Sequence, residues 1–381
     1  MQASRHFLFY ANATADIGSG HVMRLLAIAQ ACRQHNIRIS FVHDNCSAHL
    51  QQRLLDEGFR SQILVRDIVK THLADSLESY AADAIFMDDY ELKQSERTAL
   101  GKLPALLVNL DDNLPSIQPV GDIIVNPAAD ANEANYKAKL SEQTAQYCLG
   151  PRYTYLRQEF AEQAFIDIAD RQQLLITLGG ADVKNMAYPL AQALCEKLSN
   201  LDICLLLGSL NTSALSALEA LAKKHNNLIL MQQSAQVAKL MMASGLAVSA
   251  AGGTLGELAS MGVPTLALVS SDNQQAALQS PLLNTWYQAL DVRTYQEPAT
   301  SHEQQALNKQ ILEGIITQVH ELWRDLCKRQ RMSERARQII DTHGCERIVQ
   351  CVLSELNKLS EPSKVSEPSK VPEPNTKHLN Q

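Results

Sequence analysis

The chain has 381 residues, of which 45% are hydrophobic and 20% charged, and its formal net charge is -7. This length allows two domains of ordinary size, and the composition is typical of a globular protein. The negative net charge argues against a polyanion-binding surface such as that of a nucleic-acid-binding protein. A phosphorylated small ligand stays open, because glycine turns and local dipoles bind phosphate without net positive charge.

The cysteines and the N-terminal residues give an indication of the cellular compartment of the protein. The eight cysteines form no CxxC pair and no zinc spacing, and some, such as Cys204, stand inside apolar runs. That pattern is typical of reduced thiols that fill a core. The first residues show no basic-then-apolar pattern and no apolar run reaches membrane-spanning length, so we expect neither a leader nor a membrane span. We therefore expect a soluble cytoplasmic monomer that acts on a small molecule, with no nucleic acid, membrane, cofactor or metal.

Apolar strands alternate with helical stretches in the first half of the chain. Strands are predicted at residues 6–11, 38–43, 84–88, 106–110 and 123–126, with a helix beginning near residue 22. This alternation indicates a parallel sheet covered by helices on both faces. Polar residues at 88–90 and 111–113 directly follow two strands, at the edge where open α/β sheets bind ligands.

The same rhythm restarts after a pause near residue 150. Strands are predicted at 174–178, 203–207, 228–231, 246–250 and 265–269, helices at 185–198 and 235–243, and largely helical chain from 301 to 359. The final Ser-Glu-Pro-Ser-Lys-Val repeat cannot bury a core and is expected to be disordered. The sequence thus predicts Rossmann-like domains at 1–150 and 151–359, the second with the terminal helices, and a tail at 360–381.

Residues Gly18-Ser19-Gly20-His21 form a glycine turn between the first strand and the first helix. Glycines let the backbone turn sharply and approach a ligand, and the free N–H groups of the helix favour an anion. The positive end of the helix dipole favours a neutral imidazole, which could act as a general base. A capping turn with an incidental histidine explains the stretch equally well, because short glycine motifs are weak signals.

A second glycine turn follows the predicted strand at 246–250. Gly252 and Gly253 would let backbone amides approach a diphosphate, while Thr254 is expected to cap the next helix. Glu257 fits two roles: the acidic member of a capping box, or the acceptor of hydrogen bonds from ribose hydroxyls. We favour the ribose role.

Other polar residues at strand ends are less specific. In the loop at 270–275, Asp272 is expected to cap a helix, while Asn273 and Gln274 suit contact with a sugar. The turn Gly179-Gly180 is explained by ordinary turn chemistry. The aspartate pairs at 88–89 and 111–112 lack a third clustered ligand, so we reject a metal site. Tyr90 suits either sugar contact or the anchoring of its own loop.

Several of these motifs occur together in one known family. Residues 17–24, 88–90, 149–153, 156–160, 177–182, 250–254 and 272–274 resemble, in order, the signatures of the PseG/SpsG-type UDP-sugar hydrolases. The resemblance implies a GT-B architecture like that of the MurG glycosyltransferases, with UDP on the C-terminal domain and the sugar toward the N-terminal one. It also implies hydrolysis of UDP-2,4-diacetamido-2,4,6-trideoxy-β-L-altropyranose in the biosynthesis of pseudaminic acid or a related nonulosonic acid.

The resemblance also assigns roles to residues of this chain. His21 would be the base that activates a water molecule, with Tyr90 and Asn273 near the sugar or that water. A single displacement of UDP by the water would invert the anomeric carbon. The expected substrate-binding residues are Gly18, Ser19, Gly20, Arg24, Asp89, Gly179, Gly180, Gly252, Gly253, Thr254, Glu257 and Gln274.

The chain departs from the family pattern at Tyr10, Asn12, Leu25, Gly256 and Leu258, which leaves the exact sugar open. Two other functions stay open on the same scaffold: transfer of the sugar to an alcohol acceptor, and nucleotide-sugar binding without catalysis. The first domain has no evident apolar basic patch for a lipid acceptor, which weakens the transferase. A histidine beside a phosphate-binding turn brings little advantage to a protein that only binds its ligand, which weakens the alternative without catalysis.

Overall fold

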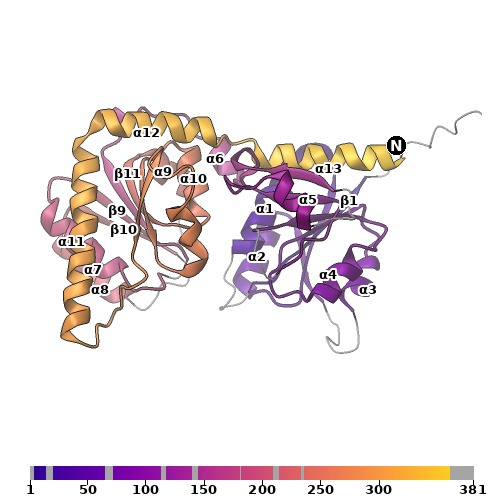
Figure 1. The fold of residues 1–381 in the computed structure, drawn as a ribbon, viewed down its shortest axis with the longest axis horizontal. Helices are drawn as coiled ribbons and strands as arrows, with labels where there is room; N and C mark the ends of the chain where they lie inside the picture. Colours follow the sequence, from indigo (N-terminus) through magenta and orange to yellow (C-terminus); the bar gives the residue numbers. More distant parts are fainter. Residues whose placement is uncertain are drawn as a thin grey trace, which may run out of the picture.

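The computed structural model describes residues 4–13, 20–64, 72–112, 117–139, 145–180, 182–208, 214–232 and 236–360. Gly18, Ser19 and the expected tail from residue 361 on lie outside these ranges. The described chain forms two separate parallel sheets that stand side by side (Figure 1). This arrangement confirms the predicted α/β class with two doubly wound, Rossmann-like halves.

The first sheet has the strand order β3-β2-β1-β4-β5-β6-β7, and every neighbouring pair is parallel. Its strands are β1 (His6–Tyr10), β2 (Arg38–His43), β3 (Arg60–Ile63), β4 (Ala84–Met87), β5 (Leu106–Leu110), β6 (Ile123–Asn126) and β7 (Gln146–Leu149). The prediction missed β3 and β7, because both are edge strands of mixed polarity. The central strands are wholly buried, which explains their nearly continuous apolar runs.

Helices cover both faces of this sheet. They are α1 (Gly20–Cys32), α2 (Ala48–Asp56), α3 (Leu73–Glu78), α4 (Gln94–Leu100) and α5 (Glu133–Lys139). Side chains alternate along β1: Phe7 and Phe9 share a core with α1 and α2, while Leu8 and Tyr10 share one with α3 and α4. The sheet therefore holds the first residues of α1 in a fixed place beside the end of β1.

The second sheet repeats this plan with the order β10-β9-β8-β11-β12-β13. Its elements are β8 (Gln173–Thr177), β9 (Asp202–Leu207), β10 (Leu228–Gln232), β11 (Ser244–Ala250), β12 (Thr265–Val269) and β13 (Tyr287–Asp291), with α7 (Ala187–Lys197), α8 (Leu215–Lys224), α9 (Val237–Met242), α10 (Thr254–Ser260), α11 (His302–Arg324) and α12 (Leu326–Ile339). The strand order reverses between β1 and β4 in one sheet and between β8 and β11 in the other. Open α/β sheets bind ligands at the carboxyl ends of the strands at this reversal.

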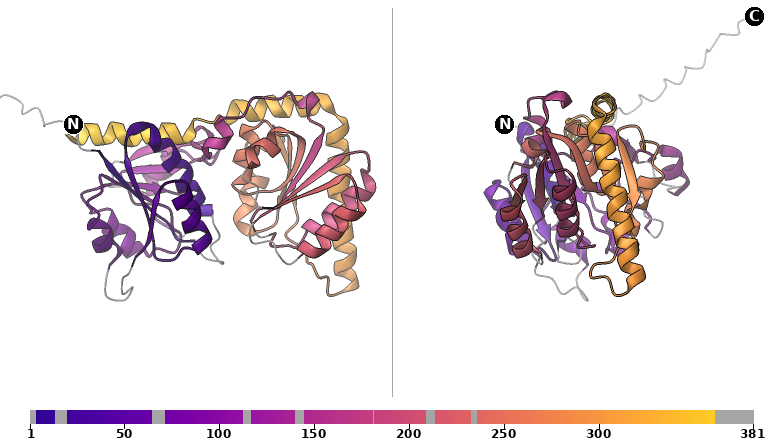
Figure 2. Two further views of the ribbon diagram at one scale, coloured as in Figure 1. Left: turned by 180° about the vertical axis from the view of Figure 1, so that it is seen from behind. Right: turned by 90° about the vertical axis from the view of Figure 1, so that its left-hand side faces the viewer.

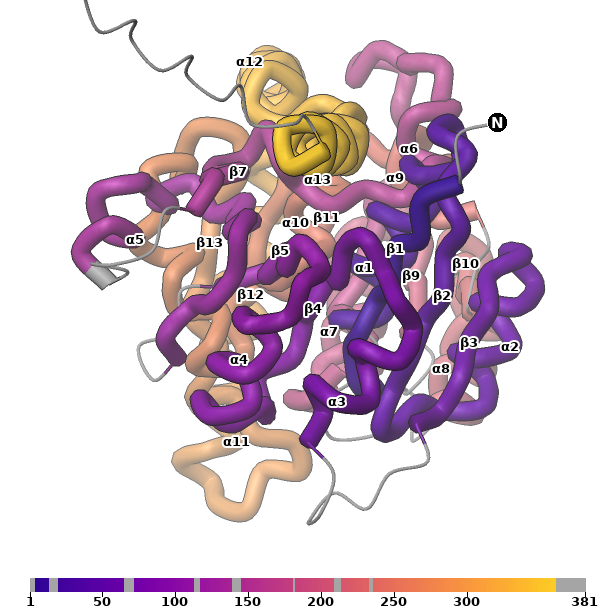
Figure 3. The backbone as a smooth tube through the Cα atoms, turned by 90° about the vertical axis from the view of Figure 1, so that its right-hand side faces the viewer, coloured from indigo at the N-terminus to yellow at the C-terminus, as the bar shows by residue number. Residues whose placement is uncertain are grey.

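The last helix corrects the predicted division of the chain. We expected all terminal helices in the second domain, but α13 (Gly344–Ser360) packs on the first, where Ile348, Val349 and Val352 join the core of Phe7 and Phe9. Figure 1 shows α12 over one domain and α13 over the other, Figure 2 shows the same crossing from behind, and Figure 3 views α13 nearly end-on. The apolar stripe of α13 predicts burial but does not specify which core receives it.

Five of the eight cysteines are buried and one, Cys327, is exposed. The buried ones occupy core positions, as Cys204 does beside Leu175 and Ala247. Among the described residues, no helix is both long enough and apolar enough to cross a membrane.

Candidate functional site

The reversal point of the first sheet brings His21 and Asp88 together. His21 is the second residue of α1, which follows β1, and Asp88 directly follows β4. The Nδ1 atom of His21 donates to Oδ1 of Asp88 at 2.6 Å, and the Asp88 side chain has no exposed surface. A neutral ring that donates from Nδ1 carries its lone pair on Nε2. The pair is thus an imidazole oriented by a carboxylate, as in a general base with its orienting partner.

Arg24 holds this pair from one turn further along α1. Its Nε donates to Asp88 Oδ2 at 2.9 Å and its Nη2 to Oδ1 at 2.7 Å, while Nη1 contacts both carboxylate oxygens of Asp112 at 2.8 and 2.9 Å. Burial by itself would raise the pKa of Asp88, but the Arg24 charge and the His21 hydrogen bond outweigh it, so this pKa lies below its ordinary value. Asp88 therefore remains an anion behind the imidazole.

Tyr90 lies at the surface beside the pair. Its ring meets the His21 ring edge-on, with centroids 4.4 Å apart, and its hydroxyl accepts from Arg24 Nη2 at 3.3 Å. Asp89 contacts its own loop and Asn12: its carboxylate accepts from the Glu91 backbone and from Asn12 Nδ2, at 2.7 and 2.8 Å. Our expected site residues included Asp89 but neither Asp88 nor Asp112. The sequence signal that could have identified Asp88 as a site residue was its position directly after a buried strand.

The reversal point of the second sheet carries glycine turns and few charges. Gly179 follows β8 with φ +79°, a conformation that favours glycine, and a Cβ there would lie 4.0 Å from the Ala250 side chain at the end of β11. An added Cβ on Gly180 or on Gly253 would have no neighbour within 4 Å among the described residues, although a Cβ on Gly208 would lie 2.5 Å from the Gly180 backbone. The two predicted turns therefore adjoin, and their backbones are accessible.

The capping roles predicted for Thr254 and Asp272 are wrong. Gly253, not Thr254, is the N-cap of α10, and no side chain caps it. Glu257 pairs across the domain with Arg157, whose Nη2 lies 3.0 Å from Oε1. Asp272 does not cap the 3₁₀ helix Asp272–Leu278 but pairs with Arg293 at 2.8 Å. Glu257 and Asp272 thus each pair with an arginine that the tertiary fold brings close.

The loop after β12 is ordered by its own polar groups. Asn273 Oδ1 accepts from Ser271 Oγ at 2.6 Å, and Gln274 Oε1 accepts from the Ser270 backbone at 2.9 Å. The Gln274 amide nitrogen lies 3.9 Å from the position that a Cβ on Gly252 would take. The structure therefore brings Gln274 beside the second glycine turn.

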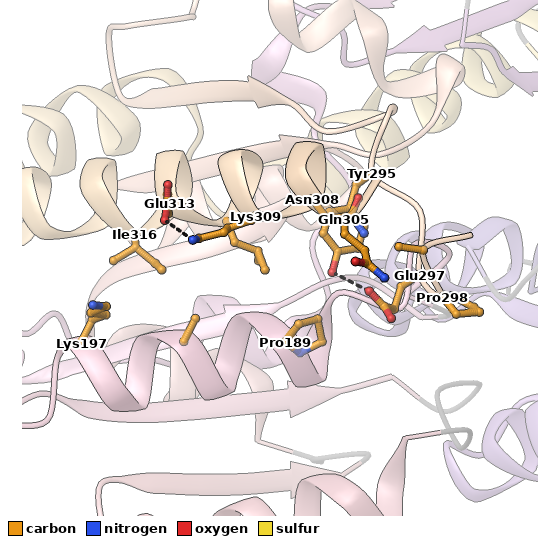
Figure 4. Close-up of a pocket in the computed structure, with 13 residues that line it drawn as sticks. Pro189, Lys197, Tyr295, Glu297, Pro298, Gln305, Asn308, Lys309, Glu313 and Ile316 are labelled. Carbon is orange, nitrogen blue, oxygen red and sulfur yellow. Dashed lines mark hydrogen bonds and ion pairs between the residues drawn. The ribbon is translucent and has the colours of Figure 1, made fainter. Parts of the chain in front are cut away.

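A groove elsewhere on the second domain lies apart from these residues. It measures about 460 Å³ and is formed by α7, α11 and the chain near Pro298. Figure 4 shows Lys309 and Glu313 paired along α11 on one of its walls. None of the predicted site residues lines it. Within the described ranges, no three His, Cys, Asp or Glu side chains gather as a set of metal ligands.

The chain is similar in sequence to two curated proteins. It is 22% identical over 269 residues to an uncharacterized protein of Methanocaldococcus jannaschii, a match that covers 69% of this chain and 55% of that protein. It is 24% identical over 251 residues to the UDP-2,4-diacetamido-2,4,6-trideoxy-beta-L-altropyranose hydrolase of Campylobacter jejuni, covering 66% of this chain and 86% of that one. No protein-family model matches the chain.

Solved structures define the fold. MurG of Acinetobacter baumannii superposes with a TM-score of 0.60 over 92% of this chain and 99% of its own, at 16% identity. A protein of Listeria monocytogenes described as a putative UDP-N-acetylglucosamine 2-epimerase gives 0.63 over 94% and 99%, at 14% identity. The chain therefore has the two-domain GT-B fold. At these identities the likeness extends to the fold alone.

Proposed function

We propose that this protein is an enzyme that acts on a UDP-sugar. Both sheets present polar or glycine-rich groups at the reversal of strand order, where such sheets bind ligands. The names of the similar proteins support the substrate class, since they include a UDP-sugar hydrolase, a putative UDP-sugar epimerase and an S. aureus structure described as a complex with UDP.

We propose further that the reaction is hydrolysis of the anomeric C–O bond of a UDP-2,4-diacetamido-2,4,6-trideoxyhexose, the β-L-altropyranose form. The observation that carries this proposal is the hydrogen bond from His21 to the buried Asp88. A hydrolase needs a base to activate water, and this arrangement leaves the Nε2 lone pair for that task. The activity of the Campylobacter relative and the family resemblance supply the identity of the sugar.

In the proposed reaction, His21 Nε2 takes a proton from water while the water oxygen attacks the anomeric carbon. The bond from that carbon to the diphosphate oxygen breaks, and UDP leaves with the electron pair. Asp88 stabilises the imidazolium that forms, and Arg24 keeps Asp88 ionised. Tyr90 and Asn273 would contact the sugar or the water. Attack opposite to the leaving group inverts the anomeric centre.

The second domain would hold the nucleotide in this proposal. The open backbones at Gly180 and Gly253 suit a diphosphate, and Gln274 beside Gly252 adds an amide donor. Glu257 would accept hydrogen bonds from the ribose hydroxyls. UDP is a good leaving group, so these neutral donors suffice without a strong general acid.

The test is incubation of the purified protein with UDP-2,4-diacetamido-2,4,6-trideoxyhexoses in H₂¹⁸O, followed by NMR and mass spectrometry. We expect UDP and free sugar, the label on the anomeric carbon, and the inverted anomer first. Label on the phosphate would overturn the proposed bond cleavage. The absence of turnover with every sugar of the panel would overturn the hydrolase.

A glycosyltransferase is the second candidate, because MurG and a Rickettsia glycosyltransferase share the fold over more than nine-tenths of this chain. The two candidates differ in what accelerates UDP release. A hydrolase releases UDP at the same rate with or without an alcohol acceptor, whereas a transferase needs the acceptor and forms a glycoside.

A further inference from the structure

Arg157 lies in the segment that joins the two sheets, and its side chain contacts both neighbouring carboxylates. It precedes α6 (Gln158–Ala161), in extended backbone conformation. Its Nη1 lies 2.5 Å from Glu159 Oε1 and its Nη2 lies 3.0 Å from Glu257 Oε1. The guanidinium also covers the Phe160 ring, 5.2 Å from its centroid. Only about 12% of the side chain is exposed, so the three contacts fix its orientation.

The anchors of Arg157 are themselves held. Glu159 Oε2 accepts from the backbone N–H of Ala238 in α9 at 3.1 Å. The backbone N–H of Gln158 donates to Gln30 Oε1 of α1 in the first domain at 2.9 Å. The guanidinium is therefore positioned from both domains before any ligand binds.

The helix that bears Glu257 packs directly on the same joining segment. A Cβ on Gly256 would lie only 2.7 Å from Thr154 Cγ2, so the first turn of α10 and this segment touch with no room for a side chain. Position 256 is one at which the chain departs from the family pattern. The close contact brings Arg157, a hundred residues earlier in sequence, within reach of Glu257.

The contact leaves the Glu257 carboxylate able to bind a ligand. Two carboxylate oxygens offer about four acceptor positions, of which Arg157 uses one. Burial raises the pKa of Glu257, and the Arg157 charge acts against that rise. Arg157 thus favours the ionised form, which accepts hydrogen bonds only.

We propose that Arg157 is a positioning residue, which fixes the Glu257 carboxylate so that it selects a nucleotide bearing a ribose 2′-hydroxyl. This inference rests on the proposed nucleotide site. It differs from direct phosphate binding by Arg157, because both terminal nitrogens of the guanidinium lie on carboxylates.

The test is calorimetric titration of the full chain with UDP and with 2′-deoxy-UDP. For wild type we expect UDP to bind about tenfold more tightly than the deoxy form, the value of a charge-assisted hydrogen bond. Arg157→Gln should bind UDP more weakly but 2′-deoxy-UDP equally well, so that most of this ratio is lost. Adding Arg157→Gln to Glu257→Gln should change neither affinity further. Arg157→Lys, with one nitrogen for two carboxylates, should restore part of the ratio.

The matched control is Lys358→Gln, which removes another cation paired with a glutamate, Glu355, on α13 and away from this site. It should leave the ratio unchanged, and circular dichroism should show that all variants fold. Equal weakening of both nucleotides by Arg157→Gln, also in the Glu257→Gln background, would overturn positioning in favour of direct phosphate contact. If Arg157→Gln changes neither the affinity for UDP nor that for 2′-deoxy-UDP, the inference is overturned and the proposed UDP binding is not. Failure of wild type to bind UDP would overturn the proposed function itself.

Discussion

The first six strands of each sheet follow one order, yet different groups lie where that order reverses: charged side chains in the first sheet and glycine turns in the second. The first presents His21, Arg24 and two aspartates joined by ion pairs and hydrogen bonds. The second presents adjoining glycine turns with open backbones. The shared topology sets where ligands can bind, and the residues at that edge set what each half can do. We therefore expect substitutions at the reversal point of the first sheet to affect turnover, and substitutions at that of the second sheet to affect nucleotide binding.

His21→Ala should have the largest effect and tests this division directly. Loss of the base should lower kcat by about 10²–10⁴-fold. The affinity for UDP should stay within about twofold of wild type, because the proposed nucleotide site lies on the other sheet. Single-turnover kinetics and calorimetry measure the two quantities. Retention of full hydrolysis would show that His21 is not the base.

Asp88→Asn should lower both activity and stability. Removing the buried anion leaves the Arg24 charge with less compensation, so we expect the free energy of unfolding to fall by about 3 kcal/mol at pH 7. The folded-state pKa of Asp88 lies below its unfolded value, so its stabilising effect is present above about pH 4 and is lost as the pH falls through the folded pKa.

Denaturant titrations of wild type and Asp88→Asn at several pH values measure this effect. The difference between the two proteins should shrink as the pH falls below about 4. A difference that is constant over the whole range would mean that the Asp88 charge does not contribute. Asp112→Asn, which changes a partner of Arg24 whose side chain is 31% exposed, should lower the free energy of unfolding much less.

Gly256→Ala should test the packing of the joining segment on the second half. The added methyl group would displace Thr154, and we expect a loss of about 1–2 kcal/mol in the free energy of unfolding. Thr154→Ser removes the facing Cγ2 atom and should restore most of the loss in the double variant. Gly253→Ala meets no described neighbour, so it should leave stability nearly unchanged. Thermal melts that rank the two glycines in the reverse order would contradict this packing.

Asp272→Ala should have the smallest effect. Its side chain is about 91% exposed, and Arg293 keeps its other partner, Asp291. The midpoint of thermal unfolding should change by less than about 2 °C, since exposed ion pairs contribute little. A large drop would show that this loop depends on the Arg293 contact.

Much of the fold could be predicted because its signals are local. Buried strands such as β1 and β4 are continuous apolar runs, and the apolar residues of α1 have helical spacing. The edge strands β3, β7 and β13 were not predicted, since their short mixed sequences show no clear alternation of apolar and polar residues. The place of α13 could not be predicted either, because an apolar stripe fits any exposed core.

The sequence by itself determined two repeated α/β units, and it put His21, Gly179 and Gly252 after the carboxyl ends of strands, where such sheets bind ligands. This was possible because strand periodicity and turn chemistry act over a few residues. Only the tertiary structure decided which charges meet. Asp88 lies 67 residues from His21, and Arg157 lies 100 residues from Glu257. Such pairs depend on strand order and domain packing, which cannot be predicted from local sequence patterns. For that reason Asp272, which was expected to cap a helix, pairs with Arg293 instead, and the pairing of Glu257 with Arg157 was not predicted.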